Sequence, residues 1–374
     1  MKNQGSSSIL TRDIFCILGL PFDTVNLSET STLINSDIEQ KQRCFLTTPN
    51  LNFLITAQSD SLFFQSVVDS DLIIADGMPI IWIAKLLGIP LTERVAGSDL
   101  FDTLSKQKVR NKKTSVFFFG GQEGIAEKAS QELNKTSQAM SCCGFYDPGF
   151  VSVDEMSTPA IIEYINKTNP DFLLVALGAG KGQAWIQRNK EQLNAPVISH
   201  LGAVVNFVAG NVIRAPVFWQ QCGLEWLWRI KQEPGLWKRY FFDGMAFLKL
   251  LSFKVCPLAF YDRKLKKSDS FKTPATINYQ YTKNNNCIVN ITGSIKHENL
   301  NNIKQAFVDI LKDKPIDVAL DCVGITYIDS AFIGTLLLFQ RQLNQQNCEL
   351  LLQNVPNHIY KLFNLNNVLN RFQF

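Results

Sequence analysis

The chain has 374 residues, of which 46% are hydrophobic, and a formal net charge of +4. This length suits two or three domains of about 150 residues, and the apolar content excludes a disordered chain. The small positive charge does not by itself indicate nucleic-acid binding. Nine cysteines with neither disulfide-type nor metal-type spacing are typical of reduced thiols in a cytosol. Since the N-terminus lacks the apolar core of a signal peptide, secretion is not expected.

Strands and helices alternate over the first 210 residues. Residues 72–75 are predicted to form a buried strand, Asp76 and Gly77 the turn at its carboxyl end, and residues 78–87 a buried helix. The same order recurs with glycine turns at Gly120, Gly121, Gly178 and Gly180. This alternation predicts a Rossmann-like α/β domain with a mainly parallel sheet. Ligands of such sheets bind beyond the carboxyl ends of the strands, where these turns fall.

The turn after the strand near residues 173–177 contains Gly178, Gly180, Lys181 and Gly182. Its spacing fits neither a phosphate-binding P-loop nor the dinucleotide fingerprint. Flexible glycines between a strand end and a helix N-terminus could bind an anion or sugar hydroxyls. A tight structural turn is the equal alternative.

Asp76 closes an apolar strand, and such an aspartate often serves as a turn former or helix cap. It could equally be a carboxylate at the mouth of a dry cleft, placed to accept a proton from a substrate hydroxyl. Thr48 and Asn50 lie upstream and could orient a sugar or a diphosphate. Arg94 lies downstream and offers a planar donor suited to phosphate.

The order and spacing of these residues resemble those of a known family. The motifs are Thr48-x-Asn50, Asp76-Gly77, Arg94 in RVAGSDL, FFFGG, GFYDPGF, INKTNPDFLLVALGAGKGQAWI and RAPVFWQQCGLEWLWRIKQEP. Over about residues 10–250 they resemble the WecG/TagA/CpsF glycosyltransferases. The resemblance implies an inverting enzyme of cell-surface polysaccharide synthesis. It would move a hexose, N-acetylmannosamine or a related sugar, from a UDP-sugar to a polyprenyl-diphosphate-linked sugar.

The resemblance also implies roles for individual residues. Asp76 matches the family's presumed base, and Thr48, Asn50 and Arg94 match its other catalytic positions. The site for the UDP-sugar would include Gly77, Gly120, Gly121, Gly178, Gly180, Gln183 and Arg214. One position departs from the family pattern, because Gly182 stands where members have a glutamine. Gln183 could replace that glutamine only if the loop shifts by one residue.

The leaving diphosphate needs positive charge from a metal or from fixed cations. Asp69-Ser70-Asp71 fits an Asp-x-Asp metal motif, but it precedes its strand and is expected at the amino end, on the wrong edge of the sheet. Helix N-termini together with Arg94 and Arg214 are therefore favoured. No metal or other cofactor is expected.

Basic and aromatic residues are mixed between Arg214 and Lys267, with eleven Lys/Arg against four Asp/Glu. No nucleic-acid motif accompanies them. A membrane surface is favoured over ordinary helix packing, because aromatics prefer the interface and basic residues attract anionic lipid. Asp243, Lys249 and Lys254 argue against a transmembrane helix. We therefore expect a cytoplasmic protein bound peripherally to the inner face of the cell membrane.

The chain is expected to divide into a transferase domain at residues 1–262, with its membrane-binding appendage at about 214–262, a linker at 263–273 and a second α/β domain at 274–374. In the last of these, VALDCVGITYIDSAFIGTLL resembles the STAS domain of anti-sigma-factor antagonists through Asp329, Ser330 and Gly334. That resemblance implies regulation or docking through a protein partner or kinase.

Ser330 is the candidate phosphorylation site, with a helix N-cap as the alternative. The competing hypothesis for the whole chain is a catalytically weak scaffold that signals through the STAS domain. The intact Thr48, Asn50, Asp76 and Arg94 favour an enzyme.

Overall fold

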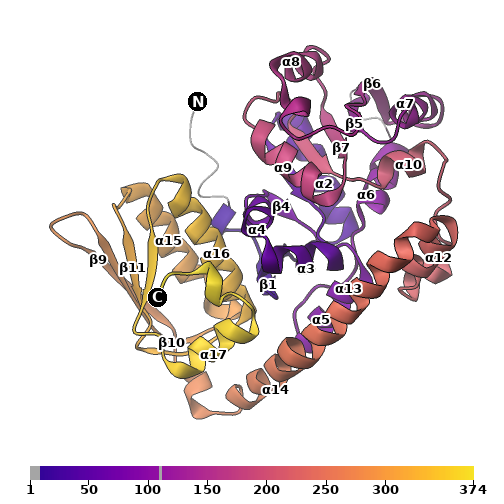
Figure 1. Cartoon of the computed structure of the whole chain (residues 1–374). Helices are drawn as coiled ribbons and strands as arrows, with labels where there is room; N and C mark the ends of the chain where they lie inside the picture. The colour runs from indigo at the N-terminus through magenta and orange to yellow at the C-terminus, as the bar shows by residue number, and fades with distance from the viewer. Residues whose placement is uncertain (1–8, 109–111) are drawn as a thin grey trace. The chain divides into compact units, whose positions relative to one another are not determined.

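The computed structural model describes residues 9–108 and 112–374, which form two compact units. The first unit comprises residues 25–81 and 92–244, and the second comprises the described residues up to 24 together with 82–91 and 245–374. Each unit contains a sheet, and both are of the α/β type (Figure 1). The predicted fold class, a Rossmann-like domain and a small α/β domain, is confirmed.

The first unit is built on a six-stranded sheet whose order is β4-β3-β8-β7-β5-β6. Its strands are β3 (Cys44–Thr47), β4 (Leu72–Ile73), β5 (Thr114–Gly120), β6 (Met140–Tyr146), β7 (Phe172–Ala176) and β8 (Val197–His200). Every neighbouring pair is parallel. Parallel strands are covered on both faces and therefore read as continuous apolar runs, as β7 does.

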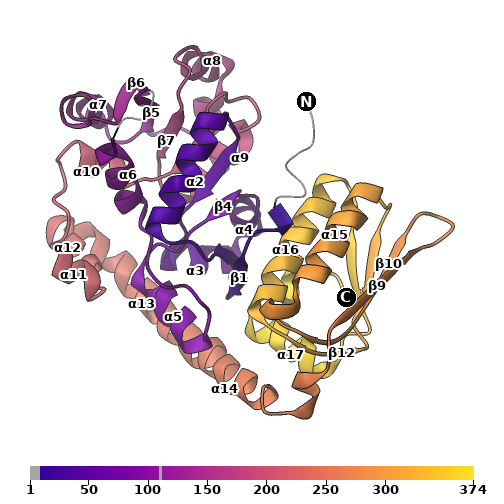
Figure 2. The ribbon, with the colours of Figure 1, turned by 180° about the vertical axis from the view of Figure 1, so that it is seen from behind.

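Helices cover both faces of this sheet (Figures 1 and 2). They are α2 (Leu27–Gln40), α3 (Leu51–Ser59), α4 (Ser61–Val68), α6 (Gly97–Lys106), α7 (Ile125–Thr136), α8 (Pro159–Lys167), α9 (Ala179–Asn189) and α10 (Val204–Val208). Successive β5 residues point to opposite faces. Phe118 packs in the core formed with α2, α6 and α7, whereas Phe119 stacks on Trp185 of α9, with 4.1 Å between ring centroids.

The second unit contains a mixed sheet of five strands, β9 (Thr276–Tyr281), β10 (Cys287–Ile295), β11 (Val318–Asp321), β12 (Ile325–Ile328) and β13 (Leu350–Gln353). Its parallel part has the order β12-β10-β11-β13, and β9 pairs antiparallel with β10. The helices of this part are α15 (Asn301–Asp313), α16 (Ser330–Gln345) and α17 (Asn357–Leu365). Figure 2 shows α15 and α16 side by side against the sheet.

A β-hairpin from the start of the chain belongs to the second unit. β1 (Ile14–Ile17) and β2 (Leu20–Asp23) pair antiparallel, and all eight strand residues are buried. β1 packs on α16 at Gly334, where a Cβ atom would lie only 3.3 Å from the Cys16 nitrogen. Lys304 of α15 donates a hydrogen bond to the Arg12 carbonyl at 2.8 Å. The hairpin therefore covers a face of α16 that would otherwise be apolar and bare.

The remaining helices are α5 (Met78–Leu87), α11 (Val217–Gln221), α12 (Glu225–Gln232), α13 (Trp237–Leu250) and α14 (Cys256–Leu265). A π-helical turn, Leu251–Val255, joins α13 to α14 without a break. The described residues contain one helix, Pro234–Leu265, that is long and apolar enough to cross a membrane, judged by length and composition alone. Large apolar side chains are exposed along it: Trp237, Phe241, Phe242, Met245, Leu248, Phe253 and Phe260.

Candidate active site

Three loops meet beyond the carboxyl ends of β3 and β4. The Asp76 amide donates a hydrogen bond to the Pro49 carbonyl at 3.0 Å, and the Val95 amide donates to the Ala75 carbonyl at 2.9 Å. These two bonds hold Asp76 between the loop that carries Thr48 and the loop that carries Arg94. The predicted residues, which are up to 46 positions apart in the sequence, are therefore brought to one edge of the sheet.

Asp76 is a partly exposed carboxylate held among charged neighbours. Burial raises its pKa from 3.8 to about 7; Arg94 opposes this rise, whereas Glu225 and Asp99 add to it and Arg229 again opposes it. Within the described residues, no group forms a hydrogen bond with its side chain. At neutral pH the carboxyl group therefore exchanges a proton readily, as a general base requires.

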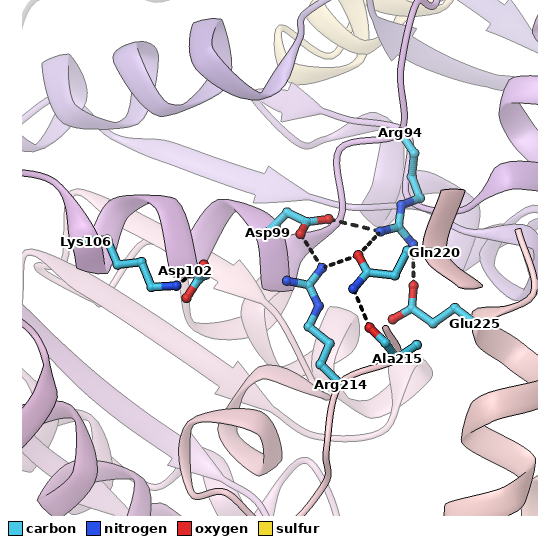
Figure 3. Close-up of polar contacts among 8 residues, drawn as sticks. All are labelled: Arg94, Asp99, Asp102, Lys106, Arg214, Ala215, Gln220 and Glu225. Carbon is cyan, nitrogen blue, oxygen red and sulfur yellow. Dashed lines mark hydrogen bonds and ion pairs between the residues drawn. The ribbon is translucent and has the colours of Figure 1, made fainter. Parts of the chain in front are cut away.

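Arg94 lies at the centre of a network of ion pairs (Figure 3). It forms an ion pair with Glu225 of α12 and a second with Asp99 of α6, the latter at 3.0 Å. Asp99 lies in the first turn of α6, where the helix dipole stabilises a carboxylate. The side chain of Arg94 is only 12% exposed, so these ion pairs are weakly screened by solvent.

Arg214 joins the same network from the segment before α11. It pairs with Asp99, and the Gln220 side-chain oxygen accepts from both Arg214 and Arg94 at 3.4 Å. The Gln220 amide nitrogen donates to the Ala215 carbonyl at 2.7 Å, which fixes the side chain (Figure 3). Arg94 and Arg214 thus share the Asp99 carboxylate, and the charge of Arg94 acts on Asp76.

Thr48 and Asn50 lie close to Asp76 but differ in their contacts. Thr48 is buried. Asn50 is the N-cap of α3, because its side-chain oxygen accepts from the Phe53 amide at 3.2 Å. Gly77 adopts φ +114°, and a Cβ atom there would lie 3.8 Å from that of Asn50. Asn50 therefore has a structural role whether or not its amide also contacts a ligand.

The predicted glycine turns lie at the same edge of the sheet. Gly120 has φ +92°, and a Cβ atom there would approach the Ala176 carbonyl oxygen to 2.8 Å, so a larger residue would be both strained and crowded. Gly121 also has a positive φ. Gly178 caps α9, and both Gly178 and Gly180 have open space where a side chain would be.

Gln183 points into the protein rather than along this glycine loop. It is completely buried and donates to the Thr47 hydroxyl at 3.3 Å, and its side-chain oxygen has no hydrogen-bond partner among the residues that the structure describes. His200 ends β8 nearby, with Nε2 2.7 Å from the Leu177 carbonyl oxygen, and burial lowers its pKa. A Cβ atom on Gly182 would collide with the His200 ring at 2.1 Å. Packing against His200 thus explains why a glycine stands at position 182.

Asp99, Gln220, Glu225 and His200 were not singled out as site residues from the sequence. Asp99 lies in the RVAGSDL motif, five residues after Arg94, and Glu225 lies in GLEWLWR. Both stretches belong to motifs that carry the family resemblance, but that resemblance gives a chemical role only to the basic residues of those motifs, Arg94 and Arg214. A charge search around Arg94 would have found Asp99, whereas Glu225 is 131 positions away and required the fold.

No group of three or more His, Cys, Asp or Glu side chains arranged to hold a metal occurs in the residues described. Asp69 accepts from Gln65 at 2.8 Å and also from Gln187. Asp71 accepts from the Phe45 amide at 2.9 Å, at the amino end of β3. The Asp-x-Asp sequence therefore lies at the sheet edge opposite Asp76, and both carboxylates serve structural bonds.

Comparisons with known sequences agree with this geometry. The sequence model described as "Glycosyl transferase WecG/TagA/CpsF family" matches residues 15–257, and one described as "Mlab, STAS domain" matches residues 280–370. Three similar proteins are N-acetylglucosaminyldiphosphoundecaprenol N-acetyl-beta-D-mannosaminyltransferases. The Bacillus spizizenii protein is 29% identical over 217 residues, which cover 58% of this chain and 82% of the relative.

The Bacillus subtilis protein is 26% identical over 224 residues, covering 60% of this chain and 85% of the relative. The Staphylococcus aureus (strain MW2) protein is 24% identical over 255 residues, covering 67% and 94%. The aligned regions thus include most of each relative, whereas the STAS match, at residues 280–370, lies wholly beyond the transferase match. The chain belongs to the WecG/TagA/CpsF glycosyltransferase family and carries a STAS domain after its transferase region.

Proposed function

We propose that the protein is an inverting glycosyltransferase of cell-surface polysaccharide synthesis. It transfers a hexose, N-acetylmannosamine or a related sugar, from a UDP-sugar to a polyprenyl-diphosphate-linked sugar. The observation that carries the proposal is Asp76, whose pKa is raised to about 7 in the field of Arg94, at the ligand-binding edge of a parallel sheet. The names of the relatives support the sugar and the lipid-linked acceptor.

The reaction is a single displacement. Asp76 removes the proton from the acceptor hydroxyl, and that oxygen forms a bond to the anomeric carbon on the face opposite the diphosphate. The bond between the anomeric carbon and the diphosphate oxygen breaks, and UDP leaves with the electron pair. The proton stays on Asp76 until solvent removes it. Because attack comes from the opposite face, the anomeric configuration is inverted.

The leaving diphosphate carries negative charge that the site must offset. Arg94 and Arg214 supply two fixed cations, and the N-terminus of α9 with Gly178 and Gly180 supplies backbone donors. Gly77, Gly120 and Gly121 let the chain approach the donor closely. Gln183 is a less direct contributor, because its buried amide acts on Thr47. Turnover is therefore expected without a metal ion.

The test measures UDP release from candidate UDP-sugars in the presence and absence of a polyprenyl-diphosphate-linked sugar. We expect release only when donor and acceptor are both present, and the same rate in excess EDTA. No release with any pair would favour the alternative function, a weak scaffold that binds lipid-linked sugars and signals through its STAS domain. If UDP release is lost in EDTA and restored by Mn²⁺, a metal ion rather than the two arginines offsets the charge of the leaving diphosphate.

The exposed aromatic helix supports a peripheral membrane location on the cytoplasmic side. Side chains such as Phe241 and Phe242 are 57% and 68% exposed and have basic neighbours in Lys238 and Arg239. Asp243, in the same helix, accepts from Asn52 of α3 at 3.3 Å, so that part of α13 is bonded to the transferase unit. A helix lying on the surface satisfies both observations.

Vesicle sedimentation tests this location. The double variant Phe241→Ser and Phe242→Ser should lose most binding to anionic vesicles, and 1 M salt should weaken binding of the wild type only in part, because apolar insertion is not screened. Phe150→Ser is the matched control, since Phe150 is 95% exposed but lies in the loop after β6. Equal sedimentation of all three proteins would exclude the helix as the membrane contact.

The STAS domain is proposed to regulate or dock the enzyme through a protein partner or kinase. Ser330 begins α16, directly after its N-cap Asp329. A phosphate there would add about −1.5 to −2 charges at a helix N-terminus, which tolerates negative charge. We expect Ser330→Asp to keep the domain folded and to weaken partner capture from lysate. Unchanged capture, with no phosphate at Ser330 by mass spectrometry, would remove this role.

A further inference from the structure

Arg94, which acts on Asp76, and its neighbour Arg214 already have carboxylate partners. Glu225 and Asp99 each form an ion pair with the Arg94 guanidinium, and Asp99 also pairs with Arg214. A diphosphate recognised by Arg94 would need the same fork of N–H donors, because a guanidinium presents its donors in one plane. The donor and the carboxylates therefore compete for the same atoms.

Asp99 and Glu225 differ in how easily each can move away from Arg94. Asp99 lies in the first turn of α6, and the core residues Leu100 and Leu104 hold that helix against the sheet. Glu225 lies in the first turn of α12, a helix with no buried residue. Moving Asp99 would disturb a core, whereas moving Glu225 disturbs only a surface helix. Glu225 is thus the partner that can leave.

We infer that Glu225 is an exchangeable counter-ion that stands in for the donor diphosphate on Arg94 and leaves when the donor binds. This rests on the proposed function in one respect, the identity of the donor as a UDP-sugar. Glu225 is a positioning residue: it keeps Arg94 extended beside Asp76 in the empty enzyme and holds α12 at the site. Donor binding then releases α12, so the helix before α13 responds to the state of the site.

The exchange predicts that a mutation beside the active site strengthens ligand binding, whereas most such mutations weaken it. Glu225→Gln keeps the size of the side chain but removes the charge that the donor must displace. UDP and inorganic pyrophosphate should each bind about tenfold more tightly to this full-length variant than to the wild type, because a ligand no longer has to displace a charge-assisted pair. The KM for the donor should fall for the same reason.

The matched control is Glu233→Gln. Glu233 ends the same helix and pairs with Arg229 at 3.0 Å, so the charge change is identical but Arg94 keeps its partner. This variant should bind both ligands as the wild type does. Hydrogen exchange gives a second measurement: pyrophosphate should speed amide exchange in residues 225–232 of the wild type, and Glu225→Gln should exchange fast without ligand.

The binding measurements separate the exchange of Glu225 from the identity of the donor. If the wild type binds UDP but Glu225→Gln binds it equally or more weakly, the exchange is wrong and the proposed donor stands. If the wild type binds pyrophosphate but not UDP, and Glu225→Gln binds it more tightly, the exchange stands and the proposed donor is wrong. If the wild type binds neither ligand, both are wrong.

Discussion

Two aspartates in this chain each follow an apolar strand and precede a helix, but their surroundings differ. Asp76 follows Leu72–Ala75 and precedes α5, and Asp329 follows β12 and precedes α16. Asp329 accepts two backbone hydrogen bonds, from Phe332 at 2.9 Å and from His297 at 2.7 Å. Asp76 accepts none within the described residues and instead lies in the field of Arg94.

Burial raises the pKa of both aspartates, so the pKa direction alone does not separate them. The difference lies in how the carboxylate oxygens are used. The oxygens of a capping carboxylate accept hydrogen bonds from backbone N–H groups, so few lone pairs remain to accept a proton from a substrate. An uncapped carboxylate of raised pKa retains that capacity. What distinguishes the two strand-ending aspartates is thus the hydrogen bonding of their carboxylates rather than their sequence context.

The largest expected effect is on turnover. Asp76→Asn should lower kcat by about 10²–10⁴-fold, the usual contribution of a general base, while UDP binding changes little. Asp329→Asn should retain wild-type turnover, because its carboxylate serves a helix in the other unit. Steady-state kinetics with donor and lipid-linked acceptor measure both. Comparable losses in the two variants would end the distinction between base and cap.

A smaller effect is expected on the pH profile. Wild-type kcat should rise as the pH increases through about 7, as Asp76 loses its proton. Arg94 lowers the Asp76 pKa, Arg229 does so too, and Glu225 and Asp99 raise it. Arg94→Gln should therefore move this rise to higher pH, in addition to lowering kcat by about 10²-fold through loss of a donor to the leaving group. A profile that stays in place would exclude Asp76 as the titrating group.

The difference in free energy of unfolding between Asp76→Asn and the wild type should grow as the pH rises. The pKa of Asp76 is about 7 in the folded chain and about 3.9 unfolded. Its contribution to stability is therefore fully present below about pH 4 and is lost as the pH rises through about 7. Asp76→Asn should accordingly match the wild type at pH 4 and have the higher free energy of unfolding at pH 8. Urea titrations at the two pH values test this, and a variant less stable at pH 8 would contradict it.

The smallest effect is expected from the cap. Asp329→Ala should lower the free energy of unfolding of the second unit by about 1 kcal/mol, the usual cost of a lost N-cap. Transferase turnover should stay at the wild-type value. Thermal unfolding followed by circular dichroism gives the first quantity. A large loss of turnover here would mean that α16 affects the catalytic unit.

The sequence predicted what depends on local pattern. Alternating strands and helices, the glycine turns and Asp76 at a strand end follow from periodicity and turn chemistry. The family resemblance was also confirmed. The ion pair of Arg94 with Glu225 could not be predicted, because it joins residues 131 positions apart and no periodicity records such a contact. Nor does a short apolar segment such as β1 reveal which helix will bury it.

The packing of the hairpin on α16 has a consequence for how the chain is made. Ile14–Asp23 leave the ribosome well before Gly334, against which Cys16 rests and which is added only after about 300 further residues. At 5–20 residues per second, roughly 15–60 s separate the two events. During that interval Ile17, Leu20 and Phe22 lack their final cover. The nascent chain should therefore be a client for holding chaperones from the time the hairpin emerges until α16 has followed it.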